Sequence, residues 1–527
     1  MNRVTFFFLT ALFLYNNSTM AQNEYLDSQF GEDGKVLLDF NGYESQINAL
    51  LLQPDGKTIV AGSYFNHGGF WKYYIDRFMA NGAYDTAFGT NGRIINEFPG
   101  KPDFRCVRIL EDAKILGCGI IYSSGSGFSQ SFLVQYNSDG SLDLSFGNQG
   151  VVILPDSANE FLVKSAGKFF VVQQVINGVT NERKLLCYNS NGTLDLTFAN
   201  NGFLDLTALL GTITVTDLEL DNEGRLLLSG SLGDNSTFVS PTQGFIARFN
   251  QNGTLDSSFN TDGILNFNYD IKNIVKSINI YQDGKILCSV DSGYYDENYY
   301  PHNVYKIIRV DRNGNFDASF GTAGVIIRPF PESSLELQSD GKILIGFRNP
   351  IQVTDPVPRT THELGITQLL PNGSIDIGFG QNGIITNSML MAAGDVQARK
   401  LPNGKIMVGL TYGPDVMSTH PQSALFRFNA ASALSGSEFE VKNNGFMVYP
   451  NPIRERLHLY FNLNQSEVLS VDLYDGNGRL VSNLLHQKSC LAGLHSEHLQ
   501  LPPTLSDGLY VLKITSGRTV TNIKLIK

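Results

Sequence analysis

One short pattern, D-x-x-F-x-x-x-G, occurs seven times in this chain and constrains its fold more than any other feature. Successive copies are 52 to 61 residues apart. A second pattern close to D-G-K-I-x-x-G lies midway through each unit and is weaker at 110–119, 165–173 and 220–230. Regular repetition on this scale indicates an array of equivalent structural units. The aspartates that begin the copies are Asp27, Asp85, Asp143, Asp195, Asp256, Asp317 and Asp376.

Each unit is expected to contain four β-strands. In the first unit these strands are predicted at 35–40, 46–53, 57–64 and 72–79. The Asp-Gly or Asn-Gly between the second and third strands favours a tight hairpin with positive φ at both turn positions. Asp112 and Ala113 occupy this place in the second unit, where we expect a different turn.

The strand pattern predicts an all-β fold. No segment within the repeats shows sustained 3.6-residue periodicity. One small four-stranded sheet cannot bury both of its faces, whereas sheets stacked radially cover one another and leave only short edges. The predicted fold class is therefore a seven-bladed β-propeller with four-stranded blades, over residues 22–433. A linear solenoid is the alternative, but its repeats are shorter and lack four-strand units.

The repeated pattern has a mechanical interpretation. We expect it to connect the outermost strand of one blade to the innermost strand of the next, with its Asp accepting backbone N–H bonds in an Asx-turn. Its Phe has the size to pack between blades, at about 1.5–3 kcal/mol per buried ring. A metal or catalytic ring of aspartates is the other interpretation, but calcium loops supply several oxygen ligands and these turns supply one or two. The phenylalanines are Phe30, Phe88, Phe146, Phe198, Phe259, Phe320 and Phe379.

The units also resemble a known family. N-G-x-L-D-x-x-F-G-x-x-G followed by D-G-K-I-L-x-G is similar to the delta-60 repeats of exported bacterial proteins, over about 27–429. Ala199 and Asn260 depart from that pattern because they replace Gly. The resemblance implies a propeller and no particular activity.

The N-terminal residues have the features of a secretory signal peptide. Arg3 precedes an apolar run at 4–15, and small residues at Thr19 and Ala21 fit a cleavage site, so residues 1–21 are predicted to be removed. A membrane anchor is the alternative, but the run is shorter than the roughly 20 residues that span a bilayer. The chain is expected not to span a membrane. Its net charge of -11 and the lack of a Lys/Arg block argue against a nucleic-acid partner.

The cysteines are few and odd in number for an exported chain. Cys106, Cys118, Cys187, Cys288 and Cys490 form no C-x-x-C pair and no zinc-site spacing. Cys106 and Cys118 fit adjacent strands of one hairpin, but the spacing does not determine whether they face the same side. We expect buried free thiols, no metal and no other cofactor.

The last eighty residues are expected to form a separate domain. A polar stretch at 434–445 is interpreted as a linker, and alternating strands over 446–527 predict a small β-sandwich. YPNP at 449–452, LYDGNGRLV at 473–481 and the strand at 508–511 resemble the type A sorting domain of the type IX secretion system. The resemblance implies recognition by the outer-membrane translocon, later removal, and a secreted or outer-surface location. An Ig-like adhesion module is the alternative.

Catalytic signatures are absent from the sequence. No nucleophile elbow, zinc-protease helix, phosphate loop or dinucleotide fingerprint occurs in a fitting context, so no catalytic residue is assigned and the chain is predicted not to be an enzyme. His495 and His498 have no third ligand nearby in the sequence and are interpreted as a strand-edge pair without consequence.

Function is therefore predicted to lie in loops. The loops between the third and fourth predicted strands differ in every unit, and variable loops on a rigid scaffold commonly carry function. Their aromatic residues suit sugars or protein surfaces, although capping of the outer strands is an equal interpretation. We predict an exported scaffold that binds a polysaccharide or a protein. A polysaccharide hydrolase or lyase with an unrecognised carboxylate pair, and a passive structural component, are alternatives. The candidate ligand-face residues are Trp71, Tyr294, Tyr295, Tyr299 and Tyr300.

Overall fold

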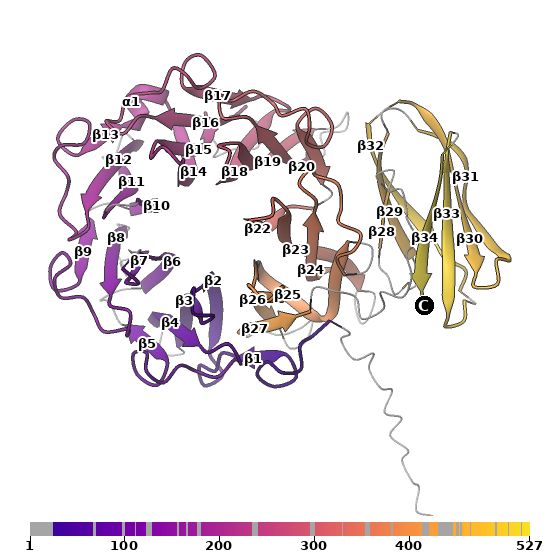
Figure 1. The fold of residues 1–527 in the computed structure, drawn as a ribbon, viewed down its shortest axis with the longest axis horizontal. Coiled ribbons are helices and arrows are strands. Elements are labelled where there is room, and N and C mark those ends of the chain that lie inside the picture. Colours follow the sequence, from indigo (N-terminus) through magenta and orange to yellow (C-terminus); the bar gives the residue numbers. More distant parts are fainter. Residues whose placement is uncertain are drawn as a thin grey trace, which may run out of the picture.

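The protein is built almost entirely of antiparallel β-sheets, which stand side by side in a ring over the repeat region (Figure 1). A computed structural model describes residues 25–527 with gaps. The gaps are 67–69, 97–100, 111, 123–128, 155–156, 165–166, 177–180, 234–240, 296–300, 329, 354–358, 381–382, 414–420, 430–445, 450–452, 454–455, 464, 491–492, 504 and 518. The predicted signal peptide at 1–21 and the linker at 434–445 lie outside the described residues.

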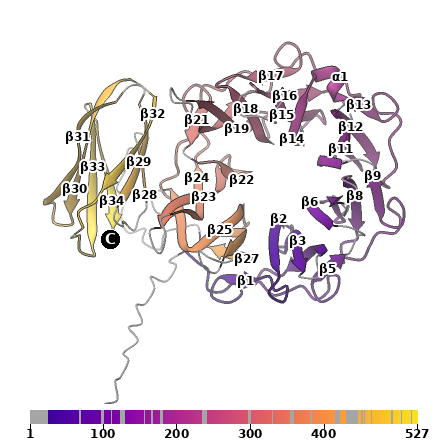
Figure 2. The same cartoon turned by 180° about the vertical axis from the view of Figure 1, so that it is seen from behind.

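Five of the sheets have four strands each, in the order of the chain. They comprise β2 (Glu44–Leu52), β3 (Thr58–Asn66), β4 (Phe70–Phe78) and β5 (Arg93–Asn96); β6 (Lys101–Ile109), β7 (Ile115–Tyr122), β8 (Ser129–Tyr136) and β9 (Val151–Leu154); β10 (Ser157–Lys164), β11 (Lys168–Ile176), β12 (Asn181–Asn189) and β13 (Phe203–Asp205); β14 (Ile213–Leu220), β15 (Leu226–Leu232), β16 (Gln243–Phe249) and β17 (Ile264–Phe267); and β18 (Lys272–Ile280), β19 (Ile286–Tyr295), β20 (Pro301–Val310) and β21 (Val325–Arg328). In each of these sheets the first strand lies nearest the middle of the ring (Figure 1 and Figure 2). One short helix, α1 (Leu206–Leu210), follows β13.

The remaining repeats form one seven-stranded sheet that closes the ring. Its order is β1-β27-β26-β25-β24-β23-β22, so the first strand of the chain pairs with the last strand of the repeats. Strand β25 pairs with β24 near its start and with β26 near its end, which joins two four-stranded units through one strand. These strands are β1 (Lys35–Leu37), β22 (Glu332–Leu337), β23 (Ile343–Val353), β24 (Arg359–Leu369), β25 (Ile384–Lys400), β26 (Ile406–Gly413) and β27 (Gln422–Phe428). The predicted all-β propeller is confirmed. The count of seven blades stays a prediction, and the pairing of β25 with both β24 and β26 is compatible with it.

The repeated motif connects different strands from those expected. Strand β5, which follows the second copy, pairs with β4 as the outermost strand of the same sheet. The expectation that the motif leads to the innermost strand of the next blade was therefore wrong. The reason is a tight reversal, in which Arg77 N–H donates to the Gly92 carbonyl and Gly92 N–H donates to the Phe88 carbonyl, so the chain folds back on the strand it has just left. The variable loops consequently join the second and third strands of each sheet.

The short turns between the first two strands of each sheet also differ from the expectation. In the first sheet the Gln53 N–H donates to the Lys57 carbonyl and only Gly56 has positive φ, at +83°, which fits a type I turn closed by a left-handed residue. The second sheet has the same turn rather than a different one. Its Ala113 adopts φ +63° and its N–H donates to the Leu110 carbonyl, as Gly56 does to Gln53.

The core lies between neighbouring sheets. The motif phenylalanines are at most 5% exposed, which confirms their predicted role as wedges. Phe88, for example, shares one apolar cluster with Tyr73 of its own sheet and with Phe104 and Phe132 of the next. Burial of successive sheets against each other is what allows four-stranded units to be stable in an array.

Replacement of Gly62 is expected to destabilise the first sheet. Gly62 lies opposite Ile47 beside a β-bulge, and a Cβ there would be 1.9 Å from the carbonyl oxygen of Gln46. This oxygen cannot retreat without separating β2 from β3, so Gly62→Ala should lower the free energy of unfolding by about 2–3 kcal/mol. Gly56→Ala is the control, because nothing lies within 4 Å of its Cβ and only its positive φ is strained, at about 1 kcal/mol. Urea denaturation measures both, and an equal or smaller loss at Gly62 contradicts the prediction.

The C-terminal segment forms two sheets that enclose one core. The first is β28-β29-β32 and the second is β31-β30-β33-β34. Leucine, isoleucine and valine side chains from both sheets, among them Leu459, Val471 and Leu512, form a single buried cluster. The strands are β28 (Phe446–Tyr449), β29 (Arg456–Leu463), β30 (Glu467–Asp475), β31 (Leu480–Cys490), β32 (Gly493–Gln500), β33 (Leu509–Ser516) and β34 (Thr519–Ile526).

Candidate functional site

The aspartates of the repeated motif form a set of equivalent ion-pair sites, which we call the Asp hubs. In every copy Oδ1 accepts the N–H of the residue two positions on, which confirms the predicted Asx-turn. In every copy Oδ2 accepts from a Lys or Arg that follows the first short turn of the sheet. These pairs are Asp27–Lys405, Asp85–Lys57, Asp143–Lys114, Asp195–Lys168, Asp256–Arg225, Asp317–Lys285 and Asp376–Lys342, at 2.5 to 3.4 Å.

Four hubs contain a second cation. Arg77 contacts Asp85 Oδ2 at 2.8 Å, stacks over Phe88 at 4.4 Å, and donates to the Ser138 carbonyl of the next repeat. Arg248, Arg309 and Arg427 repeat this arrangement. Each such Arg therefore joins a turn, a wedge and the neighbouring unit. Because the carboxylate oxygens are taken by backbone N–H groups and protein cations, we interpret the hubs as structural.

The hub of Asp27 closes the ring. Asp27 Oδ2 accepts from Arg427 at 2.5 Å and from Lys405 at 2.6 Å, across 400 and 378 residues of chain. The backbone supports this contact, since Asp27 N–H donates to the Arg427 carbonyl and Arg427 N–H donates to the Gly34 carbonyl. Burial opposes ionisation of Asp27, but the bonds from Lys405 and Arg427 hold the pKa of its carboxyl below the usual value.

The opposite end of the ring carries the variable loops and the predicted ligand-face residues. Trp71 lies in β4 opposite Phe65. Tyr294 and Tyr295 end β19, opposite His302 and Pro301 of β20. Tyr299 and Tyr300 lie outside the described residues. The structure thus assigns three of the five residues to strand ends beside these loops.

Four residues before Tyr295 on β19, Asp291 belongs to a group of charged side chains, which we call the acid pair site. Asp291 on β19 is opposite Tyr305 on β20, and Tyr305 is opposite Arg328 on β21. Directly opposed residues of adjacent strands point to the same face of a sheet, so these three side chains share one face. Glu332 begins β22 of the next unit, and its charge acts on both Asp291 and Arg328.

Burial perturbs the ionisation of the acid pair site. It raises the pKa of Asp291 to about 6, with the charge of Glu332 adding to the effect. It also raises the pKa of Glu332, against a hydrogen bond from Ser289 and the charge of Arg328. Burial lowers the pKa of the Arg328 guanidinium to about 10. Burial and mutual charge thus both favour the protonated form of these carboxyls, and a protonated carboxyl can donate a hydrogen bond as well as accept one.

The acid pair site contains polar atoms that make no hydrogen bond within the described residues. Glu332 Oε2 and Arg328 Nε are buried and have no hydrogen-bond partner there. On the neighbouring β23–β24 hairpin, Asn349 donates to Glu363 at 2.7 Å while Asn349 Oδ1 is likewise without a partner in the described part of the chain. Unsatisfied buried polar groups are uncommon in proteins and often mark functional positions.

Sequence reasoning did not find the acid pair site. Asp291 and Glu332 are 41 residues apart in the sequence, and neither belongs to a recurring motif. The available signal was the presence of charged residues inside apolar strand segments, as in ILCSVDSGYY at 286–295. Such residues are expensive to bury unless they are paired or functional.

A second group of acids lies on the inner strands. Burial raises the pKa of Asp217 to about 6, and burial with the charge of Asp217 raises the pKa of Glu219 to about 7. Arg108 on β6 faces both charges. Asp217 Oδ2 accepts the Ile278 N–H at 2.9 Å, so this carboxyl links β14 to β18 and has a structural role.

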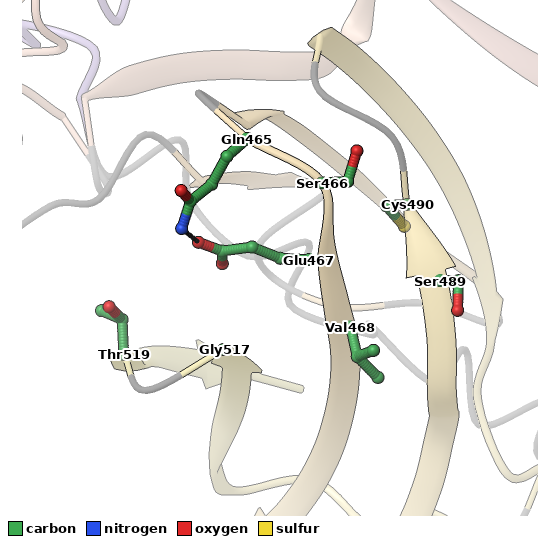
Figure 3. Close-up of a pocket in the computed structure, with 8 residues that line it drawn as sticks. All are labelled: Gln465, Ser466, Glu467, Val468, Ser489, Cys490, Gly517 and Thr519. Carbon is green, nitrogen blue, oxygen red and sulfur yellow. Dashed lines mark hydrogen bonds between the residues drawn. The ribbon is translucent and has the colours of Figure 1, made fainter.

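The C-terminal sandwich offers one open pocket and one cluster of metal-ligand types. The pocket, of about 630 Å³, lies between the starts of β30 and β34 (Figure 3). Its Glu467 already accepts from Gln465 and Ser516. No ligand is assigned there.

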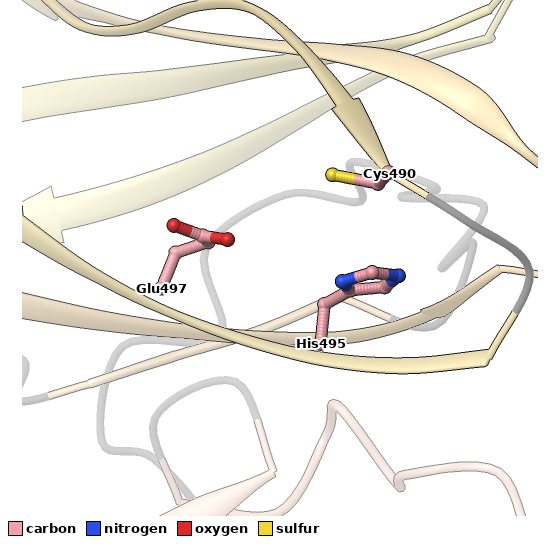
Figure 4. A group of neighbouring side chains, drawn as sticks. All are labelled: Cys490, His495 and Glu497. Atoms are coloured by element: carbon pink, nitrogen blue, oxygen red, sulfur yellow. The ribbon is translucent and has the colours of Figure 1, made fainter. Parts of the chain in front are cut away.

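The metal-ligand types are Cys490, His495 and Glu497, whose ligand atoms lie within 4.8 Å of one another (Figure 4). The expectation that His495 has no third ligand nearby was wrong, because the end of β31 in one sheet of the sandwich lies close to β32 in the other sheet. Lys488 lies 2.6 Å from Glu497 and competes with a divalent cation for this carboxylate, so we assign no metal.

Two family models match the chain. Residues 447–527 match the secretion system C-terminal sorting domain. Residues 53–88, 111–146, 166–198 and 224–259 match the domain of unknown function DUF5122, described as a β-propeller. Among curated proteins, none matches the sequence.

Solved structures resemble the chain only distantly. The polysaccharide lyase Uly1 is 10% identical, with a TM-score of 0.42 over 72% of this chain and 89% of its own. The β-propeller domain of the Trilobed protease from Pyrococcus furiosus is 12% identical, with a TM-score of 0.35 over 69% of this chain and 90% of its own. At these TM-scores the similarities carry no argument about activity.

The fold and the matched segments define a β-propeller protein with a C-terminal secretion-system sorting domain. Four of its repeats match DUF5122, consistent with the resemblance to delta-60 repeats, and its tail is that of type IX secretion. The sorting domain directs the protein to the medium or to the cell surface, as predicted. Within the described residues no helix has both the length and the apolarity to cross a membrane.

Proposed function

We propose that this protein is an exported scaffold that binds a polysaccharide or a protein through the loop end of its ring and carries out no reaction. The observation that supports this proposal is the difference between the two ends. At the end of the ring that carries the Asp hubs, which we call the hub end, six short turns have the same length, and their charges are paired within the protein. These turns are 53–57, 110–114, 221–225, 281–285, 338–342 and 401–405. At the loop end, the connections between the second and third strands range from three residues between β3 and β4 to ten residues between β15 and β16.

The acid pair site strengthens the proposal for the loop end. It brings the carboxyls of Asp291 and Glu332 and the guanidinium of Arg328 within range of one another's charge near the loop end of β19. Carboxyl and guanidinium groups make hydrogen bonds to sugar hydroxyls and to peptide groups, and Tyr294 and Tyr295 follow Asp291 on the same strand. Recognition would therefore combine flat aromatic surface with charged hydrogen-bonding groups.

Binding of polymers to the full-length protein tests this proposal. The chain with Tyr294→Ala and Tyr295→Ala should lose at least tenfold in affinity for whichever glycan or extracellular protein the wild type retains on an array. The control is Leu144→Ala with Leu196→Ala, which removes side chains that are 69% and 66% exposed at the hub end. Circular dichroism checks the fold of each variant. Equal retention of the ligand by the tyrosine variant and the wild type counts against binding at the loop end.

A polysaccharide hydrolase or lyase is the second candidate, and the acid pair site is the observation that favours it. Glycoside cleavage needs one protonated carboxyl beside a second carboxyl, and burial raises the pKa of both Asp291 and Glu332 toward the protonated form. Release of reducing ends from a bound polysaccharide, abolished by Asp291→Asn, would favour cleavage. Retention without release favours binding alone.

A further inference from the structure

Two cysteines of the second sheet face each other across one ladder. Cys106 on β6 is directly opposite Cys118 on β7, just after a β-bulge. Opposed residues of an antiparallel pair have Cα atoms about 4.5–5.5 Å apart and side chains on the same face. Disulfides need Cα atoms about 4.4–6.8 Å apart. The register therefore supplies the geometry that sequence spacing left undetermined.

The surroundings of Cys106 favour reaction. The thiol of Cys118 donates a hydrogen bond to Cys106, and this bond with the charge of Arg108 lowers the pKa of Cys106 to about 7, against the effect of burial. Arg108 Nη1 lies 2.9 Å from Cys106 Sγ. Cys106 is partly exposed, whereas Cys118 is 4% exposed. Thiolate character and access together mark the attacking thiol in disulfide exchange.

We propose that Cys106 and Cys118 form a cross-strand disulfide once the protein has left the cytoplasm. The structure holds all five cysteines as free thiols. The sorting domain sends the chain to compartments where disulfides persist. Cys187, Cys288 and Cys490 lie in β12, β19 and β31, each in a different sheet, so the pairing of Cys106 with Cys118 is unique among the five.

The reaction is an exchange with an oxidised dithiol. Cys106 thiolate attacks one sulfur of the oxidant's disulfide, which forms a mixed disulfide and releases one thiolate. Cys118, once deprotonated, attacks Cys106 Sγ and releases the second thiolate. The protein loses two electrons and two protons, the oxidant gains the two electrons, and its two thiolates take up protons from solvent.

Peptide mapping tests the pairing. The full-length protein is reduced, equilibrated under native conditions with a mixture of reduced and oxidised glutathione, alkylated and digested with trypsin. Cleavage after Arg105, Arg108 and Lys114 should leave residues 106–108 joined to residues 115–164. The joined peptide has about 2 Da less mass than its two thiol parts. Alkylation of both cysteines, or a joint between either of them and another cysteine, overturns the proposal.

A redox-dependent melting temperature provides the second test. Closing this short loop should raise the Tm of the propeller by about 3 °C, and a phosphine reductant should remove that increment. Cys106→Ser should lower the Tm to the reduced value and abolish the response to reductant. Cys288→Ala, which removes a fully buried thiol elsewhere, should keep the response. A wild-type Tm that does not change with reductant contradicts a formed bond.

Discussion

Asp27→Asn is expected to lower the free energy of unfolding of the propeller by about 3–5 kcal/mol and to open the ring. The substitution keeps the Asx-turn, because the amide oxygen still accepts the Gln29 N–H. It removes the negative charge from Arg427 and Lys405, of which Arg427 is almost fully buried. A buried cation that loses its partner costs far more than the pair contributes in net stability.

The matched control is Asp85→Asn, which disrupts the same kind of hub inside the chain. Asp85 holds Arg77 and Lys57, so a similar loss of stability is expected. Only Asp27, however, joins the two ends of the repeat region. Hydrogen exchange at β1 and β27 should therefore accelerate in Asp27→Asn and not in Asp85→Asn. If both variants leave these amides equally protected, the ring is not closed by this hub.

Acidification is expected to lower the free energy of unfolding of the ring by several kcal/mol between about pH 4 and pH 2. Hydrogen bonds from Lys168 lower the pKa of Asp195 to about 2, and hydrogen bonds from Ser319 lower that of Asp317 to about 2. The pKa values of the other five hub carboxyls are also lowered. A carboxyl with a depressed folded-state pKa contributes stability above its unfolded pKa and loses it as the pH falls through the folded value. One pKa unit is about 1.4 kcal/mol, so Asp195 and Asp317 contribute on the order of 2 kcal/mol each.

The acids with raised pKa values act in the opposite direction. Asp217 and Asp291, at about 6, and Glu219, at about 7, take up protons on folding in weak acid. Stability should therefore rise as the pH falls from about 7 to about 5, pass through a maximum, and then decline. Guanidinium denaturation from pH 8 to pH 2 measures this curve.

Asp195→Asn tests the predicted loss of stability at low pH. This variant should be about 2 kcal/mol less stable than the wild type at pH 6, and the difference should shrink as the pH falls through 2. A difference that stays constant with pH would show that the charge of Asp195 does not contribute.

The candidate site was predictable only in part. Variable loops and aromatic residues predicted a ligand face, and Tyr294 and Tyr295 do end a strand beside such a loop. Their role in binding stays a prediction. The acid pair of Asp291 and Glu332 could not be inferred, because the two residues meet only where one sheet packs against the next. Side-chain proximity across sheets depends on register and packing, which local sequence does not encode.

What the sequence determined by itself was local. The repeat determined the structural unit, the motif aspartates determined the Asx-turns, and the motif phenylalanines determined the wedges between sheets. The C-terminal segment determined the sorting domain. Each of these features depends on residues that are close together in the chain. The tertiary structure decided which sheet the strand after the motif joins, how β1 closes the ring on β27, and that Cys106 faces Cys118. These outcomes depend on hydrogen bonding between strands far apart in sequence, where spacing permits more than one pairing and only the packed ring selects among them.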